Sequence, residues 1–454
     1  MINKILIANR GEIAVRIIRA CREMGIDTVA VYSEIDKDAL HVQLADESIC
    51  IGPAMAKDSY LKMDRILSAA LITGADAIHP GFGFMAENPK FADLCHKCNL
   101  IFIGPSADII SKMGDKSEAR KTMIKAGIPV VPGTESPVTT AVEGQKVANK
   151  LGYPVMIKAS AGGGGKGMRL VNNSDEFLTS FENARQEAKN AFGDDRLYIE
   201  KYIPNARHIE FQILRDHYGN IVHLGERDCS IQRRHQKLIE EAPAYGISED
   251  LRREMGDMAI KAAQTINYTN AGTVEFILDE NYNYYFIEMN TRLQVEHGIT
   301  EMVTGIDIVK EQIKIADSKK LDIKQEDVMI KGHAIECRIN AEKPRDNFLP
   351  SPGLVTNLHL PGGCGVRIDT AIYHNYLIPP TYDSLIAKLM VHDDNREMAI
   401  RKLIGVLGEF VIEGVDTNAD FLFSLVNHYK YKNGLIDTGF VENLLSEIRM
   451  KTVS

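Results

Sequence analysis

Carboxylates and an amide recur at strand spacing past the middle of the chain. The runs 273–278 (TVEFIL) and 285–297 (YFIEMNTRLQVEH) alternate apolar and polar residues, as half-buried strands do. The polar link between them is typical of a hairpin, so Glu275 would lie on one strand, and Glu288 and Asn290 would share a face of the next. Two carboxylates and an amide oxygen are hard ligands that suit Mg²⁺. The pattern predicts a metal cradle, and hence an enzyme.

Three more polar side chains, Arg292, Gln294 and Glu296, continue at the same spacing of two residues. A cation, an amide and a base would therefore lie beside the metal. The competing interpretation is a solvated strand face with paired surface charges. It fits poorly, because the strands are otherwise apolar and burying unpaired carboxylates costs several kcal/mol.

A run of four glycines follows the predicted strand 154–160, within the sequence AGGGGKGMR at 161–169. It contains a literal G-x-G-x-x-G, but it lies mid-chain and no helix follows at once. It is not a P-loop either, because Lys166 precedes glycine rather than Ser or Thr. Glycine backbone can approach phosphate oxygens and close over them, and Lys158 would add a cation nearby. The alternative is a plain surface hairpin.

Three shorter segments suit a nucleotide or an anion. The tetrapeptide 200–203 (EKYI) could line a slot for adenine. The basic run 232–237 (QRRHQK) resembles a nucleic-acid patch, but no aromatic residues interleave it and two glutamates follow closely. A cationic wall for an anionic substrate fits it better. Arg338 alternates with apolar neighbours and should point inward, either paired structurally or aimed at a ligand.

The composition is that of an ordinary globular protein. The chain has 454 residues, 44% hydrophobic and 25% charged, and its net charge of −9 argues against nucleic acid as the main partner. Such a length predicts about two to four domains. No apolar run is long enough to span a membrane and no signal peptide is predicted, so we expect a cytoplasmic protein. Seven scattered cysteines favour reduced thiols, and the pair Cys95 and Cys98 lacks a second pair for zinc.

The elements that must position these side chains begin with an α/β region. Apolar strand runs at 4–8, 28–32, 75–79 and 100–104 alternate with helical stripes, which predicts an open, mostly parallel sheet. Ligands on such sheets bind at the carboxyl ends of the strands, where Asn9-Arg-Gly and the run HPGFGF from His79 fall. A helical connector with Lys116, a small α/β unit and a long mixed sheet from His208 follow, and then short strands and helices.

Six motifs occur in order along the chain. They are NRGEIA from Asn9, HPGFGF from His79, KASAGGGGKGM from Lys158, ERDCSIQRRHQK from Glu226, EMNTRLQVEH from Glu288 and ECRINAE from Glu336. The chain resembles biotin carboxylase, the ATP-grasp subunit of biotin-dependent carboxylases, over essentially its whole length.

The resemblance implies an α/β and α+β protein with the ATP-grasp fold. An N-terminal Rossmann-like (pre-ATP-grasp) domain would span 1–115. The ATP-grasp region would span 116–330, with a small mobile lid at about 130–203. A large C-terminal mixed-sheet domain would span 331–447.

The resemblance also implies roles for individual residues. ATP would contact Lys116, Lys158, Gly164, Gly165, Met168, Glu200, Lys201, Tyr202, Ile203, His208, Gln232, His235 and Ile277. Mg²⁺ or Mn²⁺ would bind Glu275, Glu288 and Asn290. Bicarbonate would meet Lys237, Arg292, Gln294, Val295 and Glu296, and biotin would meet Arg338 and Phe82. The catalytic residues would be Glu296 as general base, with Arg292, Arg338 and Lys237.

The implied reaction is ATP-dependent carboxylation of biotin by bicarbonate. Glu296 would deprotonate bicarbonate for attack on the γ-phosphate, giving carboxyphosphate, which breaks down to CO₂ and phosphate. Phosphate would take the N1′ proton of biotin, Arg338 would stabilise the ureido oxygen, and N1′ would attack CO₂. The sequence shows neither a Met-Lys-Met carrier hairpin nor a carboxyltransferase region. A separate biotin carboxyl carrier protein and carboxyltransferase subunits are therefore expected, as in acetyl-CoA carboxylase or, alternatively, pyruvate or another acyl-CoA carboxylase.

Three positions depart from the family pattern. Phe82 replaces a frequent Tyr, Gly298 replaces the usual Pro, and Cys364 replaces an apolar aromatic residue of a dimer interface. Arg19 and Glu23 match the other interface positions, so a homodimer is still expected.

Two other hypotheses remain. A different ATP-grasp ligase would share the metal cradle without needing Arg338 or the run from Arg292 to Glu296. A non-catalytic ATP-binding regulator would be expected to have lost the base or a metal ligand, and this chain has neither loss.

Overall fold

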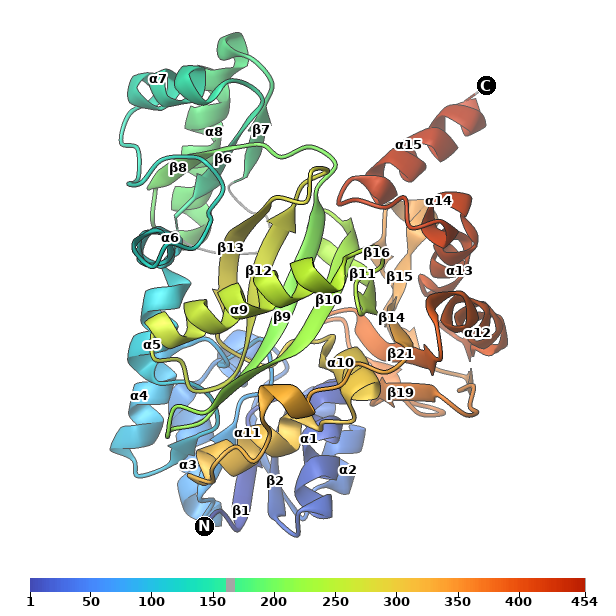
Figure 1. Cartoon of the computed structure of the whole chain (residues 1–454). Coiled ribbons are helices and arrows are strands. Elements are labelled where there is room, and N and C mark those ends of the chain that lie inside the picture. Colours follow the sequence, from blue (N-terminus) through green and yellow to red (C-terminus); the bar gives the residue numbers. More distant parts are fainter. Residues whose placement is uncertain (161–167, 454) are drawn as a thin grey trace.

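The structure is a computed structural model that describes residues 1–160 and 168–453 (Figure 1). Two residues expected to contact ATP, Gly164 and Gly165, lie outside the described residues. No helix in the described part of the chain is both long and apolar enough to cross a membrane.

The N-terminal part contains a parallel sheet of five strands in the order β3-β2-β1-β4-β5. Its strands are β1 (Lys4–Ile7), β2 (Asp27–Ser33), β3 (Glu47–Gly52), β4 (Ala77–His79) and β5 (Ile101–Phe102). The expected parallel α/β region is therefore confirmed. The edge strand β3 was not anticipated, because most of its side chains are exposed or half-buried and give no apolar run.

Helices cover both faces of this sheet, as parallel strands require. Helix α1 (Gly11–Glu23) lies on one face, and α3 (Met63–Thr73) and α4 (Pro89–Lys97) lie on the other. Helix α2 (Leu40–Leu44) packs beside α1, and α5 (Ala107–Gly114) packs on α4. The short 3-10 turns are η1 (Glu34–Asp36) and η2 (Ala56–Asp58). The side chain of Asn9, directly after β1, donates to the carbonyl oxygens of Pro80 and Phe82, both at 2.7 Å. The carboxyl ends of β1 and β4 are thereby joined, as their sequences predict.

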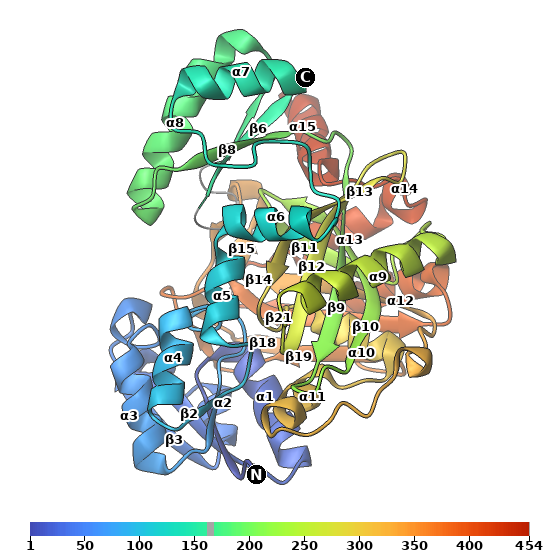
Figure 2. The same cartoon turned by 60° about the vertical axis from the view of Figure 1, so that its left-hand side comes forward.

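A small unit with its own core follows helix α6 (Lys116–Lys125). Its antiparallel sheet has the order β7-β6-β8. The strands are β6 (Val155–Ala159), β7 (Arg169–Val171) and β8 (Leu197–Lys201), and the helices are α7 (Ala141–Leu151) and α8 (Ser174–Phe192). Phe177 and Phe181 of α8 are fully buried against Val155 and Ile157 of β6. Figures 1 and 2 show this unit at the top of the molecule, far from the N-terminal sheet.

An eight-stranded sheet occupies the centre, in the order β13-β12-β9-β10-β11-β14-β21-β19. The strands are β9 (Arg207–Arg215), β10 (Ile221–Arg233), β11 (Gln236–Ala242), β12 (Asn270–Leu278), β13 (Tyr284–Asn290), β14 (His333–Asn340), β19 (Val366–Thr370) and β21 (Leu385–Asp393). These strands pair antiparallel, and a parallel bridge joins Val130 to Phe286 of the edge strand. Because β11 pairs with β14, the sheet continues across residue 331. The division into domains at 116–330 and 331–447 stays a prediction.

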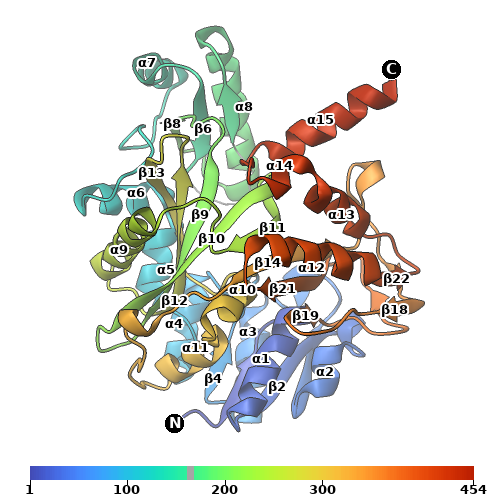
Figure 3. The same cartoon turned by 45° about the vertical axis from the view of Figure 1, so that its right-hand side comes forward.

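The faces of this sheet carry different elements. Helix α9 (Glu249–Thr265) packs on β9 and β10, while α10 (His297–Thr304) packs on β10, β11, β14 and β21. Helix α12 (Arg396–Glu409) packs on β14 and β21 through an apolar core (Figure 3). The remaining elements are α11 (Ile308–Ala316), η3 (Gln325–Asp327), β15 (Glu342–Lys343), η4 (Pro344–Asp346), β16 (Leu349–Pro350), β17 (Gly353–Leu354), β18 (Asn357–His359), β20 (Leu377–Ile378), β22 (Val411–Glu413), α13 (Ala419–Asn427), α14 (Tyr429–Lys432) and α15 (Phe440–Val453).

Candidate active site

The carboxylate hairpin has the predicted form. Strands β12 and β13 pair antiparallel, and Glu275 lies directly opposite Glu288, so both side chains share one face. The Asn290 amide donates to Glu275 Oε1 at 2.6 Å. Glu288 Oε2 lies 3.0 Å from Lys116 Nζ, at the first position of α6. Carboxylate and amide oxygens at this spacing fit a hard divalent cation.

The prediction that the strand spacing continues beyond Asn290 was wrong. Strand β13 ends at Asn290, and the segment 291–296 is a compact loop that leads into α10. The Arg292 guanidinium folds back and donates to Gln294 Oε1 at 2.8 Å and to Asn290 Oδ1 at 3.1 Å. Gln294 in turn donates to Glu275 Oε1 at 3.2 Å. Alternation in a short polar segment cannot separate a strand from a loop whose side chains bond one another.

The start of this loop is held by Glu87 of the N-terminal part. Glu87 accepts from Arg292 Nε at 2.9 Å, from the Thr291 backbone N–H at 3.1 Å and from the Thr291 hydroxyl at 3.3 Å. Glu87 was not identified from the sequence, because nothing local distinguishes it from a surface glutamate and its partners are more than 200 residues away.

The predicted base, Glu296, is fully buried between cations. Its carboxylate accepts from Lys237 Nζ and from Arg338 Nη2, the latter at 2.9 Å, and the Cys229 thiol lies 3.7 Å away. Burial alone would raise the pKa of Glu296, but Lys237, Arg338 and Arg227 outweigh it and hold the pKa well below its usual range. Glu296 is therefore ionised, and it can take a proton once a ligand draws these cations away.

Arg338 points inward, as predicted, and it is paired there. Its Nε donates to Glu240 at 2.6 Å while Nη2 donates to Glu296. A second chain of ion pairs supports Lys237: Lys237 Nζ lies 2.6 Å from Glu210 Oε2, and the fully buried Arg227 contacts Glu210 Oε1 at 2.6 Å. Glu210 and Arg227 were not identified from sequence, although Glu210 alternates with buried apolar residues along β9 and so could have been found.

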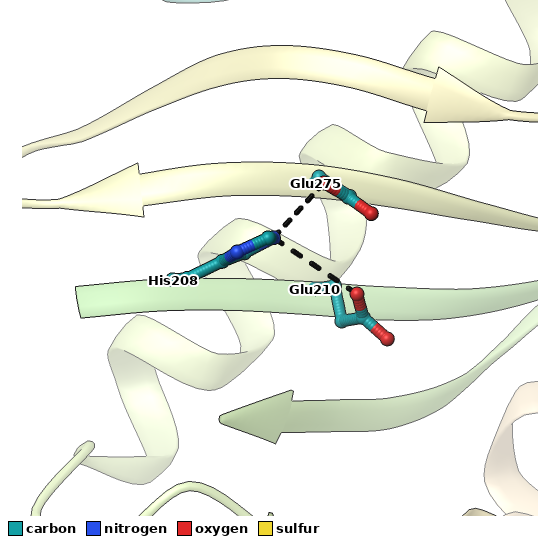
Figure 4. Close-up of side chains that lie close together, drawn as sticks. All are labelled: His208, Glu210 and Glu275. Carbon is teal, nitrogen blue, oxygen red and sulfur yellow. Dashed lines mark ion pairs between the residues drawn. The ribbon is translucent and has the colours of Figure 1, made fainter. Parts of the chain in front are cut away.

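Two clusters of potential metal ligands surround this centre, in the part of the chain that the structure describes. One comprises His208, Glu210 and Glu275, from neighbouring strands (Figure 4). His208 Nε2 lies 2.9 Å from Glu275 Oε2 and 4.0 Å from Glu210 Oε2. Burial lowers the pKa of His208, but Glu275 outweighs burial and the net shift is upward. The other cluster is Glu210, Cys229 and Glu296. Both clusters adjoin Lys237, whose ammonium group already compensates part of the negative charge of their carboxylates.

The residues expected to contact ATP lie on the small unit and on the central sheet. In the small unit, β6 carries Lys158 and β8 carries Glu200 and Lys201, with Met168 just before β7 and Tyr202 and Ile203 just after β8. In the central sheet, β9 carries His208, β10 carries Gln232, β12 carries Ile277, and the β10–β11 turn carries His235. Lys158 Nζ contacts Glu200 Oε2 at 2.6 Å. Burial, and after it Lys158 and Lys116, lower the pKa of His235, so this ring is neutral at neutral pH. The Lys201 ammonium instead donates to the carbonyls of Gly152 and Tyr153 within the small unit.

The three positions that depart from the family pattern lie in different environments. A Cβ added to Gly298 would lie 2.3 Å from the sulfur of Met390, so Met390 of β21 occupies the space that a side chain there would take. Phe82 is half-buried and packs against the core that contains α1. Cys364 is an exposed free thiol. Of the two expected dimer positions, Arg19 is exposed and Glu23 pairs with Lys310.

Three stretches of the chain match known families. Residues 1–110 match the biotin carboxylase N-terminal domain, 115–324 the ATP-binding domain of the carbamoyl-phosphate synthase L chain, and 336–443 the biotin carboxylase C-terminal domain. The chain is 58% identical over 443 residues to biotin carboxylase 1 of Bacillus subtilis, covering 97% of this chain and 98% of that protein. It is 52% identical to a pyruvate carboxylase subunit of Methanothermobacter thermautotrophicus, covering 97% of this chain and 90% of that one.

Solved structures agree with these matches. A biotin carboxylase–β,γ-ATP complex from Campylobacter jejuni is 49% identical, with a TM-score of 0.96 and coverage of 98% of this chain and 99% of that one. The biotin carboxylase domain dimer of 2-oxoglutarate carboxylase from Hydrogenobacter thermophilus, crystallised with MgADP, ADP and bicarbonate, is 49% identical, with a TM-score of 0.94 and coverage of 98% of each chain.

Proposed function

Because the chain belongs to the biotin carboxylase family, we propose that it supplies the biotin carboxylase subunit of an acetyl-CoA carboxylase. The chain is an ATP-dependent ligase that carboxylates biotin with bicarbonate. One observation supports our assignment of the catalytic residues: a buried, ionised Glu296 between Lys237 and Arg338, joined through Gln294 to the carboxylate hairpin.

The residues of the loop 291–296 and of the central sheet have different roles in the proposed reaction. Bicarbonate that enters beside Arg292 and Gln294 attracts Lys237 and Arg338, which now neutralise Glu296. Released from those ion pairs, Glu296 becomes a stronger base and takes the bicarbonate proton as the oxygen attacks the γ-phosphate of ATP. Arg338 then faces the ureido oxygen of biotin, where negative charge develops as N1′ attacks CO₂.

The nucleotide binds between the small unit and the hairpin in this proposal. Lys116, Lys158 and His208 supply positive charge for the phosphates, and His235 supplies a neutral hydrogen-bond donor. A divalent cation held by Glu275, Glu288 and Asn290 would add charge neutralisation at the transferred phosphate. Lys116, which contacts Glu288 in the structure, would contact the phosphates from the other side.

Partners are proposed from the relatives. A separate biotin carboxyl carrier protein presents biotin, and carboxyltransferase subunits choose the acyl acceptor. Membership of a pyruvate carboxylase is the second candidate, since a component of such an enzyme is 52% identical. A homodimer is proposed because a relative crystallised as a biotin carboxylase domain dimer. Adding the carrier protein and carboxyltransferase of an acetyl-CoA carboxylase or of a pyruvate carboxylase distinguishes the candidates, since malonyl-CoA or oxaloacetate would be the product.

The test of the central reaction is ATP hydrolysis measured with and without bicarbonate, and with and without free biotin. Hydrolysis should require bicarbonate and increase with biotin. Glu296→Gln should lose activity by at least about a hundredfold, while Glu249→Gln, at an exposed helix position, should not. ATP turnover that ignores both bicarbonate and biotin would indicate a different ATP-grasp ligase, and ATP binding without turnover would indicate a regulator.

Arg338→Ala separates the two half-reactions. It should impair carboxylation of free biotin more than bicarbonate-dependent ATP hydrolysis, because the guanidinium faces biotin in our assignment. Equal losses in both half-reactions would contradict that role.

A further inference from the structure

A lysine lies fully buried beneath the loop 291–296, which we call the catalytic loop because it carries the proposed base. Lys388 is in the middle of β21, directly opposite Arg338 of β14, and none of its surface is exposed. Its neighbours Ala387 and Leu389 face the apolar core on the other side of the sheet. Burying an ammonium group is costly unless it is paired and hydrogen-bonded, so its partners indicate what it does.

The shortest polar contact of Lys388 is to the backbone of the catalytic loop. Its Nζ donates to the carbonyl oxygen of Val295 at 2.8 Å. Two carboxylates lie farther away, Glu12 Oε1 of α1 at 3.3 Å and Asp369 Oδ2 of β19 at 3.7 Å. Burial lowers the pKa of Lys388, but Glu12, Glu336 and Asp369 outweigh it and the net shift is upward. The group is therefore a charged donor at neutral pH.

The contact links three parts of the chain that are remote in sequence. Glu12 belongs to the motif NRGEIA in the N-terminal part, Lys388 to the C-terminal part of the central sheet, and Val295 to the loop before the base. Glu87 holds the start of that loop, and the His297 ring contacts the Gln294 carbonyl at 2.8 Å at its end. The bond from Lys388 fixes the peptide between Val295 and Glu296, which lies between those two anchors.

We propose that Lys388 is a positioning residue for bicarbonate: by holding the Val295 carbonyl it orients the Val295 backbone and Glu296 toward the bound anion. This inference rests on the proposed function. A lysine that served only to neutralise Glu12 and Asp369 would not need the carbonyl as its closest partner. Loss of the bond would leave the peptide free to turn, which would weaken bicarbonate binding and misplace the base without altering the ATP site.

The test compares steady-state kinetics of bicarbonate-dependent ATP hydrolysis for Lys388→Met and Lys388→Arg. Met has a similar length but neither charge nor donor, so the KM for bicarbonate should rise about tenfold or more while the KM for ATP changes less than about twofold. Arg keeps the charge and the donors and should restore the KM for bicarbonate to within about threefold of wild type. A folded Lys388→Met enzyme with an unchanged KM for bicarbonate, or an equal rise in both Met and Arg variants, would overturn the proposal.

Arg396→Met is the matched control. Arg396 is also a buried cation, but it pairs with Glu241 at 2.7 Å, and Glu241 points to the opposite face of β11 from Glu240. This variant should lose thermal stability and keep the KM for bicarbonate. If it raised that KM as much as Lys388→Met does, general destabilisation would explain both effects and the proposal would fail.

If Lys388→Met does not fold, the same kinetic comparison is made with Glu12→Gln. It removes one carboxylate that holds the ammonium in place, so the KM for bicarbonate should rise about threefold with the KM for ATP unchanged; a bicarbonate KM equal to that of wild type would overturn the proposal. Wild-type protein without bicarbonate-dependent ATP hydrolysis would contradict the proposed function itself. Failure of the proposed function is therefore distinguishable from failure of the proposal for Lys388.

Discussion

The predicted base is kept ionised by the same cations that the substrates would engage. Glu296 is buried, yet its pKa lies well below the usual value because Lys237, Arg338 and Arg227 outweigh the effect of burial. Such a carboxylate is charged at neutral pH and only weakly basic while its partners stay in place. In the proposed mechanism, an anionic substrate that engages these cations would therefore also activate the base.

Arg338→Met should move the acid limb of the pH profile upward. Without the Arg338 cation, the effect of burial is less fully opposed, so the pKa of Glu296 rises. At low pH a larger fraction of Glu296 is then protonated and cannot act as a base. The measurement is kcat/KM, calculated on the bicarbonate concentration present at each pH, from about pH 4.5 to 8.5 without biotin. An acid limb at the wild-type position would show that Arg338 does not control this carboxylate; Arg401→Met, at an exposed site, is the control.

Gly298→Ala tests how Met390 fills the space beside the base. The new Cβ would lie 2.3 Å from the Met390 sulfur, so a buried side chain must move, at a cost of about 1–3 kcal/mol. Thermal unfolding should show the loss. In combination with Met390→Val the cost should be smaller than the sum of the single effects. Strict additivity of the two substitutions would indicate that the residues do not compete for space.

At the scale of elements, the middle of strand β14 has one apolar and one ionic side. On β14, Ile335, Cys337 and Ile339 enter the core beneath α12, while Glu336 and Arg338 alternate with them on the other side. Glu240 lies opposite Glu336, so two carboxyls lie side by side in this buried layer. Burial raises the pKa of Glu240 to about 7 and that of Glu336 well above its usual value. The layer therefore holds a proton near neutral pH.

Glu336→Gln should be tolerated at low pH and become stabilising as pH rises. Neither carboxyl oxygen of Glu336 has a hydrogen-bond partner among the described residues. Since the folded-state pKa is raised, wild type is most stable below the unfolded-state value and loses stability as pH rises toward the folded-state value. Glutamine does not titrate and avoids that loss. The melting temperature of the variant minus that of wild type should therefore increase from about pH 5 to pH 8, and a constant difference would contradict a protonated Glu336.

At the scale of the whole molecule, an ion pair within the N-terminal part supports its contact with the C-terminal part. Arg10, directly before α1, contacts Asp36 through two hydrogen bonds of 2.7 Å, and its guanidinium stacks over Tyr382 of the C-terminal part at 4.1 Å. Together with Glu12 and Glu87, this contact places the N-terminal sheet against the loop that carries the base. The N-terminal part thus helps to build a site whose chemical groups mostly come from elsewhere.

Asp36→Asn should weaken this docking. Asp36 is almost fully buried and also accepts from the Tyr60 hydroxyl, so the change leaves Arg10 without its counter-charge, at a cost of about 3–5 kcal/mol. Burial raises the pKa of Asp36, but Arg10 outweighs it and the net shift is downward, so the pair stabilises above the unfolded-state pKa and is lost in acid. Denaturant unfolding should show a difference from wild type that shrinks as pH falls below about 4. A difference independent of pH would contradict this account.

Local patterns in the sequence determined the local structure and its chemistry. Alternation placed Glu275 and Glu288 on paired strands and pointed Arg338 inward, and apolar runs predicted the parallel sheet, because side-chain direction repeats every two residues along a strand. Tertiary structure alone brought Glu87 and Lys388 to the catalytic loop and turned 291–296 out of the sheet. Those contacts join segments far apart in the chain, and hydrophobic periodicity carries no information about which distant segments pack together.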